Sequence, residues 1–178
     1  MTPGIDIRIQ SIINGLNDVI FPAVDPKESL AAEQKGMIIA QLELILKQLP
    51  FVDRYHSLCR DDMRQCAERM LAGAAGGTAT LAACEALKEM LAAPADNPRD
   101  DYNRVGQAVD ALIAAIGQDG DAGYRAQADA IMLGLADRQL WRDRVWSADL
   151  GFDPYPAELC SIEDMATGKV APPNNSGN

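Results

Sequence analysis

The sequence predicts an all-α protein, a bundle of about five or six helices with an irregular C-terminal extension. Apolar residues recur every three or four positions through most of the chain, which is the spacing of one helix face. Alanine, leucine, glutamate and glutamine are common, whereas β-branched and aromatic residues are sparse after Ile20. The 178 residues suit one domain, which we expect over 1–165, followed by a polar tail over 166–178.

Two helices are predicted before residue 50. The first covers 5–20 and ends before Pro22, because proline removes a backbone donor and disfavours helix in the preceding residue. The second covers 26–49, with Asp25 as N-cap and Pro26 in the first helical position. Its apolar residues extend well beyond one stripe, so we expect it at the centre of the bundle or in an oligomer interface.

Four further helices are predicted, over 51–72, 79–92, 98–117 and 122–148. The glycine-rich segment 73–77 breaks the pattern, and either Thr78 or Thr80 is expected to cap the helix that follows. Asn97 and Asp121 are the expected N-caps of the last two helices. The glycine-rich segment lacks the lysine and the preceding strand of a phosphate-binding loop, so we do not expect a phosphate site there.

The third predicted helix carries the most distinctive pattern, a stripe that we name the sulfur seam. One helix face carries a valine, the only histidine, two cysteines and two methionines. These residues are Val52, His56, Cys59, Met63, Cys66 and Met70. The favoured interpretation is bundle core, since thiols and thioethers pack as apolar groups. The alternatives are a soft-metal site built on His56, Cys59, Met63 and Cys66, a haem site, or a reactive thiol.

If the sulfur seam is core, its cysteines and methionines should be buried, and His56 should meet a polar partner near one end of the bundle. His56 is also the one candidate for a catalytic base, because imidazole titrates near neutral pH. However, Asp61 and Asp62 point off the seam, and no serine or threonine nucleophile is placed beside it. We therefore favour a non-enzymatic protein, and we expect no cofactor.

A second cluster lies near the C-terminus and combines aromatic residues with arginine: Trp141, Arg142, Trp146, Phe152 and Tyr155. This composition is typical of a protein-partner hot spot or of a pocket for an anionic, partly apolar ligand. Alternatively, the segment folds back and caps the bundle, with its arginines near a helix C-terminus.

Composition excludes several classes of partner. The net charge of −10 and the pI near 4.5 argue against nucleic acid and anionic membranes, which bind clustered lysine and arginine. No segment approaches the roughly 18 apolar residues of a membrane span, and the N-terminus does not resemble a secretory signal. The four cysteines lack a disulfide-framework spacing, so we expect a reducing, cytoplasmic location.

One family resemblance is present over the first quarter of the chain. The segment 16–25, LNDVIFPAVD, followed by a helix rich in glutamine and leucine, resembles the opening of uncharacterised bacterial helical proteins. Those proteins accompany acyl-CoA dehydrogenase-like and aminoglycoside-phosphotransferase-like enzymes. The resemblance implies an accessory role in acyl or aromatic-acid metabolism and assigns no functional residue.

The sequence therefore leads to one main hypothesis and two alternatives. The main hypothesis is an interaction or accessory protein that forms a homo-oligomer or binds a protein partner. The first alternative is a binder of a small apolar or acyl-type ligand between helices. The second is the soft-metal or haem site on the sulfur seam.

Overall fold

The computed structural model describes residues 3–25 and 27–172, and over these ranges the chain is helical with no β-strand. The predicted all-α bundle class is confirmed. The helices form two compact units, each described by itself below. Of the described residues, the terminal unit contains those within 3–52 and 143–167, and the central unit contains 53–142 and 168–172.

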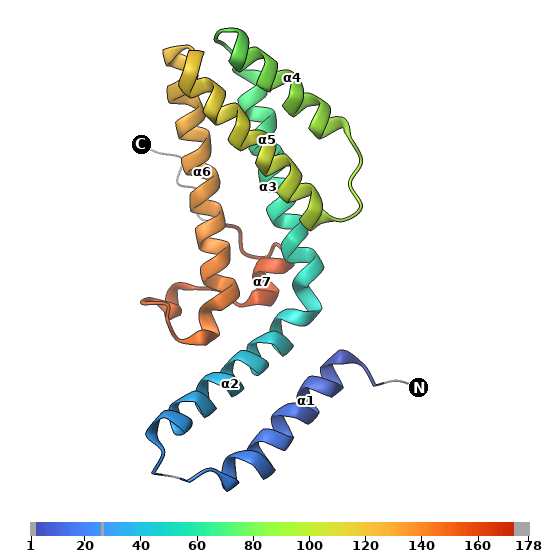
Figure 1. The fold of residues 1–178 in the computed structure, drawn as a ribbon, viewed down its shortest axis with the longest axis vertical. Helices are drawn as coiled ribbons and strands as arrows, with labels where there is room; N and C mark the ends of the chain where they lie inside the picture. The colour runs from blue at the N-terminus through green and yellow to red at the C-terminus, as the bar shows by residue number, and fades with distance from the viewer. Residues whose placement is uncertain (1–2, 26, 173–178) are drawn as a thin grey trace. The chain divides into compact units, whose positions relative to one another are not determined.

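The terminal unit begins with an antiparallel helical hairpin (Figure 1). Its first helix, α1, covers Ile5–Gly15 and continues as a π-helical turn over Leu16–Ile20. A 3₁₀ turn over Phe21–Ala23 then contains Pro22 and ends the helical path as predicted. The second helix, α2, covers Ser29–Gln48.

The start of α2 differs from the sequence prediction. The helix begins at Ser29, three residues after the expected start at Pro26. Asp25 does not cap it, because the Asp25 Oδ1 accepts a hydrogen bond from Lys27 N (2.9 Å) and closes a separate turn. Pro26 itself lies outside the described residues.

The remaining elements of the terminal unit are short. A 3₁₀ turn over Leu49–Phe51 follows α2, and further 3₁₀ turns cover Ala148–Leu150 and Pro156–Glu158. The small helix α7 covers Ile162–Ala166, with Ser161 as its N-cap. Two polar contacts hold the end of α2 to this part of the chain: Lys47 pairs with Asp149 (2.7 Å), and Gln48 donates to Trp146 O (2.8 Å).

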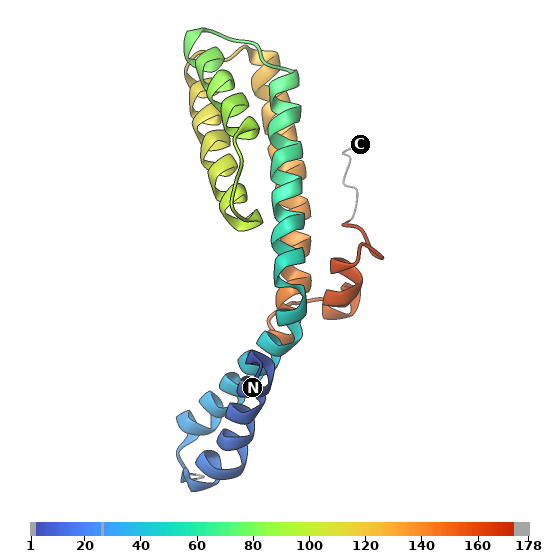
Figure 2. The same cartoon turned by 90° about the vertical axis from the view of Figure 1, so that its right-hand side faces the viewer.

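The central unit is built on four helices: α3 (Val52–Ala72), α4 (Thr78–Ala92), α5 (Pro98–Asp119) and α6 (Ala122–Ser147). In Figure 2, α4 lies beside α5, and α3 runs alongside α6. The four helices enclose one apolar core, in which the largest fully buried side chains are Met70, Leu87, Val105, Val109 and Leu112. The apolar periodicity of the sequence therefore places these side chains inward, as expected for a bundle.

The N-terminus of α4 is capped from another helix. The expected side-chain caps Thr78 and Thr80 do not act as such, because α4 begins after Gly77. Instead, the carboxylate of Asp119, the last residue of α5, accepts hydrogen bonds from Ala79 N (2.8 Å) and Thr80 N (2.9 Å). It also accepts one from the Thr80 hydroxyl (2.7 Å). Asp119 thus satisfies free amides of the first turn of α4.

Glycine is required where the segment 73–77 meets the α5–α6 turn. Gly76 and Gly120 form an isolated antiparallel bridge. A Cβ atom at Gly76 would lie 2.9 Å from Gly120 Cα, and one at Gly120 would lie 2.6 Å from Ile116 O. The glycines therefore serve close backbone packing. The other two predicted caps are confirmed: Asn97 accepts from Asp100 N (2.9 Å), and Asp121 accepts from Gly123 N (2.8 Å).

A buried carboxylate joins three parts of the central unit. Asp101 of α5 is 3% exposed and binds Arg64 of α3 through both carboxylate oxygens. Arg104 donates to the same carboxylate (3.0 Å). Both arginines also reach the end of α4, where Arg64 donates to Leu91 O (3.1 Å) and Arg104 donates to Ala93 O (2.8 Å). The network thus fixes α3, α5 and the α4 C-terminus together.

The described helices include none that is both long and apolar enough to cross a membrane. The expectation of one domain over 1–165 stays a prediction, because two compact units can still fold cooperatively.

We expect Asp101→Ala to lower the free energy of unfolding by about 1–3 kcal/mol, because it leaves the partly buried guanidinium groups of Arg64 and Arg104 without their counter-charge. Urea unfolding followed by circular dichroism measures this change. Asp110→Ala is the matched control on the exposed side of α5, and it should stay within about 0.5 kcal/mol of wild type. An equal, small effect of both substitutions would contradict the network's role.

Asp119 should make stability depend on pH in acid. The hydrogen bond from the Thr80 hydroxyl, followed by the amide of Ala79, lowers the pKa of Asp119 below its ordinary value. A depressed pKa stabilises the fold fully above the unfolded value of about 3.9, and this stabilisation is lost as pH falls through the folded value. The gap in Tm between wild type and Asp119→Asn should therefore be largest near neutral pH and shrink below about pH 4. Asp110→Asn, at an exposed position of the same helix, is the control for the removal of one carboxylate.

Candidate interaction surface

The sulfur seam lies inside the central unit. Cys59, Met63, Cys66 and Met70 are all buried, as the core interpretation predicted. Both cysteines of the seam face α6, where Cys66 Sγ lies 3.7 Å from Met132 Sδ and Cys59 Sγ lies 3.8 Å from an Arg142 nitrogen. Burial raises the pKa of the Cys66 thiol, which disfavours the reactive thiolate. These contacts describe a packed helix interface.

His56 is the exception on the seam. Its ring is half-buried and meets Tyr55 edge-on, with 5.5 Å between ring centroids. Within residues 3–25 and 27–172 it has no hydrogen-bond partner, so the expected polar partner is not found there. The physical reason is exposure, since a half-buried imidazole can be hydrated and does not need a protein acceptor.

The acids nearest His56 in the sequence are engaged elsewhere. Asp61 pairs with Arg60 (2.7 Å), whereas Asp62 binds Arg138 (3.2 Å) and Arg142 on α6. Because these carboxylates are paired, they do not orient His56 as a base. In the described chain, histidine, cysteine and acidic side chains also form no group of three that could hold a metal ion. The structure thus assembles neither a catalytic site nor a ligand set of those residue types around His56.

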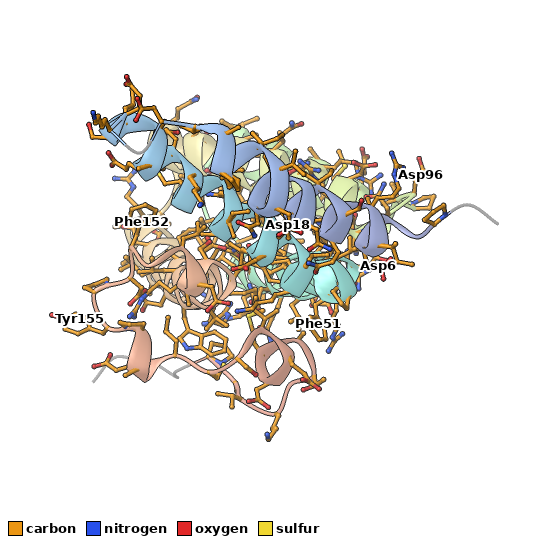
Figure 3. All side chains as sticks on the ribbon, turned by 90° about the horizontal axis from the view of Figure 1, so that it is seen from below. Asp6, Asp18, Phe51, Asp96, Phe152 and Tyr155 are labelled. Atoms are coloured by element: carbon orange, nitrogen blue, oxygen red, sulfur yellow. The ribbon has the colours of Figure 1, made fainter. Side chains whose placement is uncertain are left out.

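The residues of the predicted C-terminal cluster differ in how far they are buried. Arg142 is buried and bonded to Asp62 and Gln139, so it is not available to an anionic ligand. Trp141 and Trp146 are half-buried. Phe152 and Tyr155, labelled in Figure 3, are 79% and 62% exposed. Their loop is held by the bidentate pair of Arg144 with Asp153. Only the last two aromatic residues therefore remain candidates for an exposed partner contact.

The largest concentration of exposed apolar residues lies elsewhere, on the N-terminal hairpin. Ten of the seventeen large hydrophobic residues that the described chain exposes fall between residues 5 and 45. They are Ile5, Ile7, Ile12, Val19, Ile20, Val24, Leu30, Met37, Ile38 and Ile45. Ile13 of α1 and Leu44 of α2 are the buried residues of these two helices. This concentration makes the hairpin the candidate interaction surface, because large exposed apolar patches are uncommon on monomers.

Helical spacing arranges six of these residues in one stripe on α1 and two neighbouring stripes on α2. Ile5 and Ile12 are seven residues apart on α1, and seven residues make nearly two complete turns. On α2 the same spacing separates Leu30 from Met37 and Ile38 from Ile45. We name the six residues of these stripes the hairpin face.

The α1 stripe and the Ile38–Ile45 stripe lie on the same side of the hairpin, whereas the Leu30–Met37 stripe lies about 80° farther round α2, toward its side away from α1. On α1, the stripe is about 100° back from the buried Ile13. On α2, Ile38 is about 60° back from Lys35, whose ammonium lies 5.0 Å from the Phe21 ring and so marks the side toward the first helix. Because the two helices run antiparallel, displacement in the same rotational sense brings the α1 stripe and the Ile38–Ile45 stripe to one side.

The hairpin carries a small share of the net negative charge of the chain. Between residues 3 and 51 it carries six acidic and four basic residues, a net charge of −2 out of −10 for the whole chain. Residues 52–100 carry the same net charge, with eight acidic and six basic residues, and the remaining −6 falls on residues 101–178. Like charges thus oppose contact through the hairpin less than through the C-terminal part of the sequence.

Comparison with known proteins identifies no relative: no family model, no curated protein and no solved structure matches the chain. The resemblance of residues 16–25 to bacterial accessory proteins therefore stays a prediction.

The sequence pattern indicates only the α2 part of this surface. The apolar residues of the second helix extend around more than one face, and this pattern predicts a helix at the centre of a bundle or in an interface. The stripe on α1 gave no such signal, because its isoleucines have the spacing of an ordinary buried face. Which part of that face α2 covers depends on the packing of the hairpin.

The packed seam predicts a large effect of side-chain truncation. Met63→Ala should lower the free energy of unfolding by about 2–5 kcal/mol, because it removes buried contacts and leaves a cavity. Chemical denaturation measures the loss, and Leu140→Ala, at an exposed site of α6, should change stability much less. A small effect of Met63→Ala would contradict the assignment of the seam to the core.

Proposed function

We propose that the protein acts by self-association, through pairing of the hairpin face with the same face of a second copy. The observation that carries the proposal is the concentration of exposed large apolar residues on α1 and α2. The hairpin encloses little core of its own, since Ile13 and Leu44 are the buried residues of its two helices. Two-helix hairpins of this kind gain stability when a further layer of helices covers them.

A second copy supplies a suitable cover. Two antiparallel hairpins that meet through their apolar sides give a four-helix bundle with a new core between them. Such a contact is isologous, because each partner offers the same residues and a twofold rotation closes the pair. Leu30, Met37, Ile38 and Ile45 of α2 supply most of the apolar surface for it.

Charge permits this mode of pairing. The hairpin contributes only −2 of the net charge, so two hairpins can approach with weak repulsion. No catalytic residue enters this proposal, in agreement with the engagement of Asp61 and Asp62 by arginines.

The test uses two leucines of matched exposure. Leu30 on the hairpin face is 67% exposed, and Leu133 on α6 is 68% exposed. In a symmetric dimer Leu30→Glu changes the interface twice, so we expect a loss of about 3 kcal/mol or more, a roughly hundredfold rise in the dimer Kd. Size-exclusion chromatography with light scattering over a dilution series measures it, and Leu133→Glu should leave the Kd unchanged.

Two outcomes would overturn the proposal. The first is a wild-type protein that stays monomeric up to about 100 µM, far above the range of ordinary specific dimers. The second is an equal effect of Leu30→Glu and Leu133→Glu, which would show that general apolar exposure causes association.

A further inference from the structure

A cavity of about 500 Å³ lies inside the terminal unit, away from the hairpin face. It opens where the end of α2 and the turn after it meet the Ala148–Leu150 turn and the start of α7. Its walls are mainly apolar and include Leu46, Phe51, Val145 and Ile162. This volume and this lining are typical of small-molecule sites.

The polar groups of the cavity are few and have a net negative charge. Lys47 and Asp149 neutralise each other through their 2.7 Å ion pair. Glu163, in the first turn of α7, is exposed and has no ion-pair partner in the described part of the chain. A ligand that enters the cavity therefore meets an apolar interior with one uncompensated carboxylate beside it.

We propose that this cavity binds a small aliphatic ligand with a single cationic head, in which the alkyl chain contacts the apolar walls and an ammonium group pairs with Glu163. The chemistry of the lining selects this class. An alkyl carboxylate would place a second negative charge near Glu163, and the lysine that could offset it is already paired with Asp149.

The volume sets the ligand size. At about 30 Å³ for each water-sized group, an eight-carbon chain fills about half of the cavity and leaves room for its head and for hydration at the opening. Octylamine is thus a suitable probe. Octanol and octanoate have the same chain length with a neutral and an anionic head.

The cavity contains its own reporter group. Cys160 lines it and is half-buried, whereas the other three cysteines are at most 5% exposed. A neutral thiol reagent such as iodoacetamide should therefore label Cys160 first in the folded protein. A ligand in the cavity covers this thiol and slows its labelling.

The experiment measures the rate of Cys160 alkylation by mass spectrometry in the full-length protein, with each of the three probes. Saturating octylamine should slow labelling at least fivefold, octanol should protect at higher concentration, and octanoate should protect least. In Glu163→Gln the preference for octylamine over octanol should disappear while octanol still protects. Glu163 is exposed, so this variant tests the charge argument with an intact fold.

A matched pair of alanine substitutions tests the location. Ala148 lines the cavity, whereas Ala157 lies in the exposed 3₁₀ turn Pro156–Glu158. Ala148→Phe should abolish protection by filling the space, and Ala157→Phe should keep it. The inference is overturned if no probe slows labelling of the wild type, if octanoate protects as well as octylamine, or if Ala148→Phe is still protected. It does not depend on self-association, which the Leu30→Glu measurement tests by itself.

Discussion

The arrangement of the central unit depends on one buried charge, the carboxylate of Asp101. An isolated carboxylate at 3% exposure would be strongly unfavourable, so the fold must bring cations to it. Arg64 and Arg104 meet this requirement, and the same guanidinium groups bind carbonyl oxygens at the end of α4. The hydrogen bond from Arg64, reinforced by that from Arg104, lowers the pKa of Asp101. One ionised group thereby fixes the positions of three helices around the apolar core.

The two units differ in how completely they bury their apolar side chains and pair their polar ones. In the central unit, the sulfur seam packs against α6, Asp119 caps α4, and Asp101 is surrounded by arginine. In the terminal unit, the hairpin keeps large isoleucine, leucine and methionine side chains at the surface. A chain that completes one core and leaves another apolar face open has a surface suited to association. This contrast is the physical basis of the proposed function.

Much of the fold follows from local sequence rules. The helices over 51–72 and 79–92 were expected to within one residue of α3 and α4, and Asn97 and Asp121 cap as predicted. The errors have a common cause. Thr78 and Thr80 are good local cap residues, yet Asp119 takes the role from 39 residues or more away in sequence. The sequence predicts one cluster of aromatic residues around Arg142, but this arginine is buried and paired with Asp62, so it does not belong to an exposed surface.

The sequence by itself determined the helical class, the inward direction of the cysteines and methionines on α3, and the breaks at proline and glycine. These features depend on residue spacing and backbone sterics, which act within a few residues. Only the tertiary structure decided which stripe of α1 stays exposed, which arginines neutralise Asp101, and where the end of α2 and the start of α7 leave a cavity. Each of these depends on contacts between residues far apart in the chain, and the pattern along one helix carries no information about its neighbour.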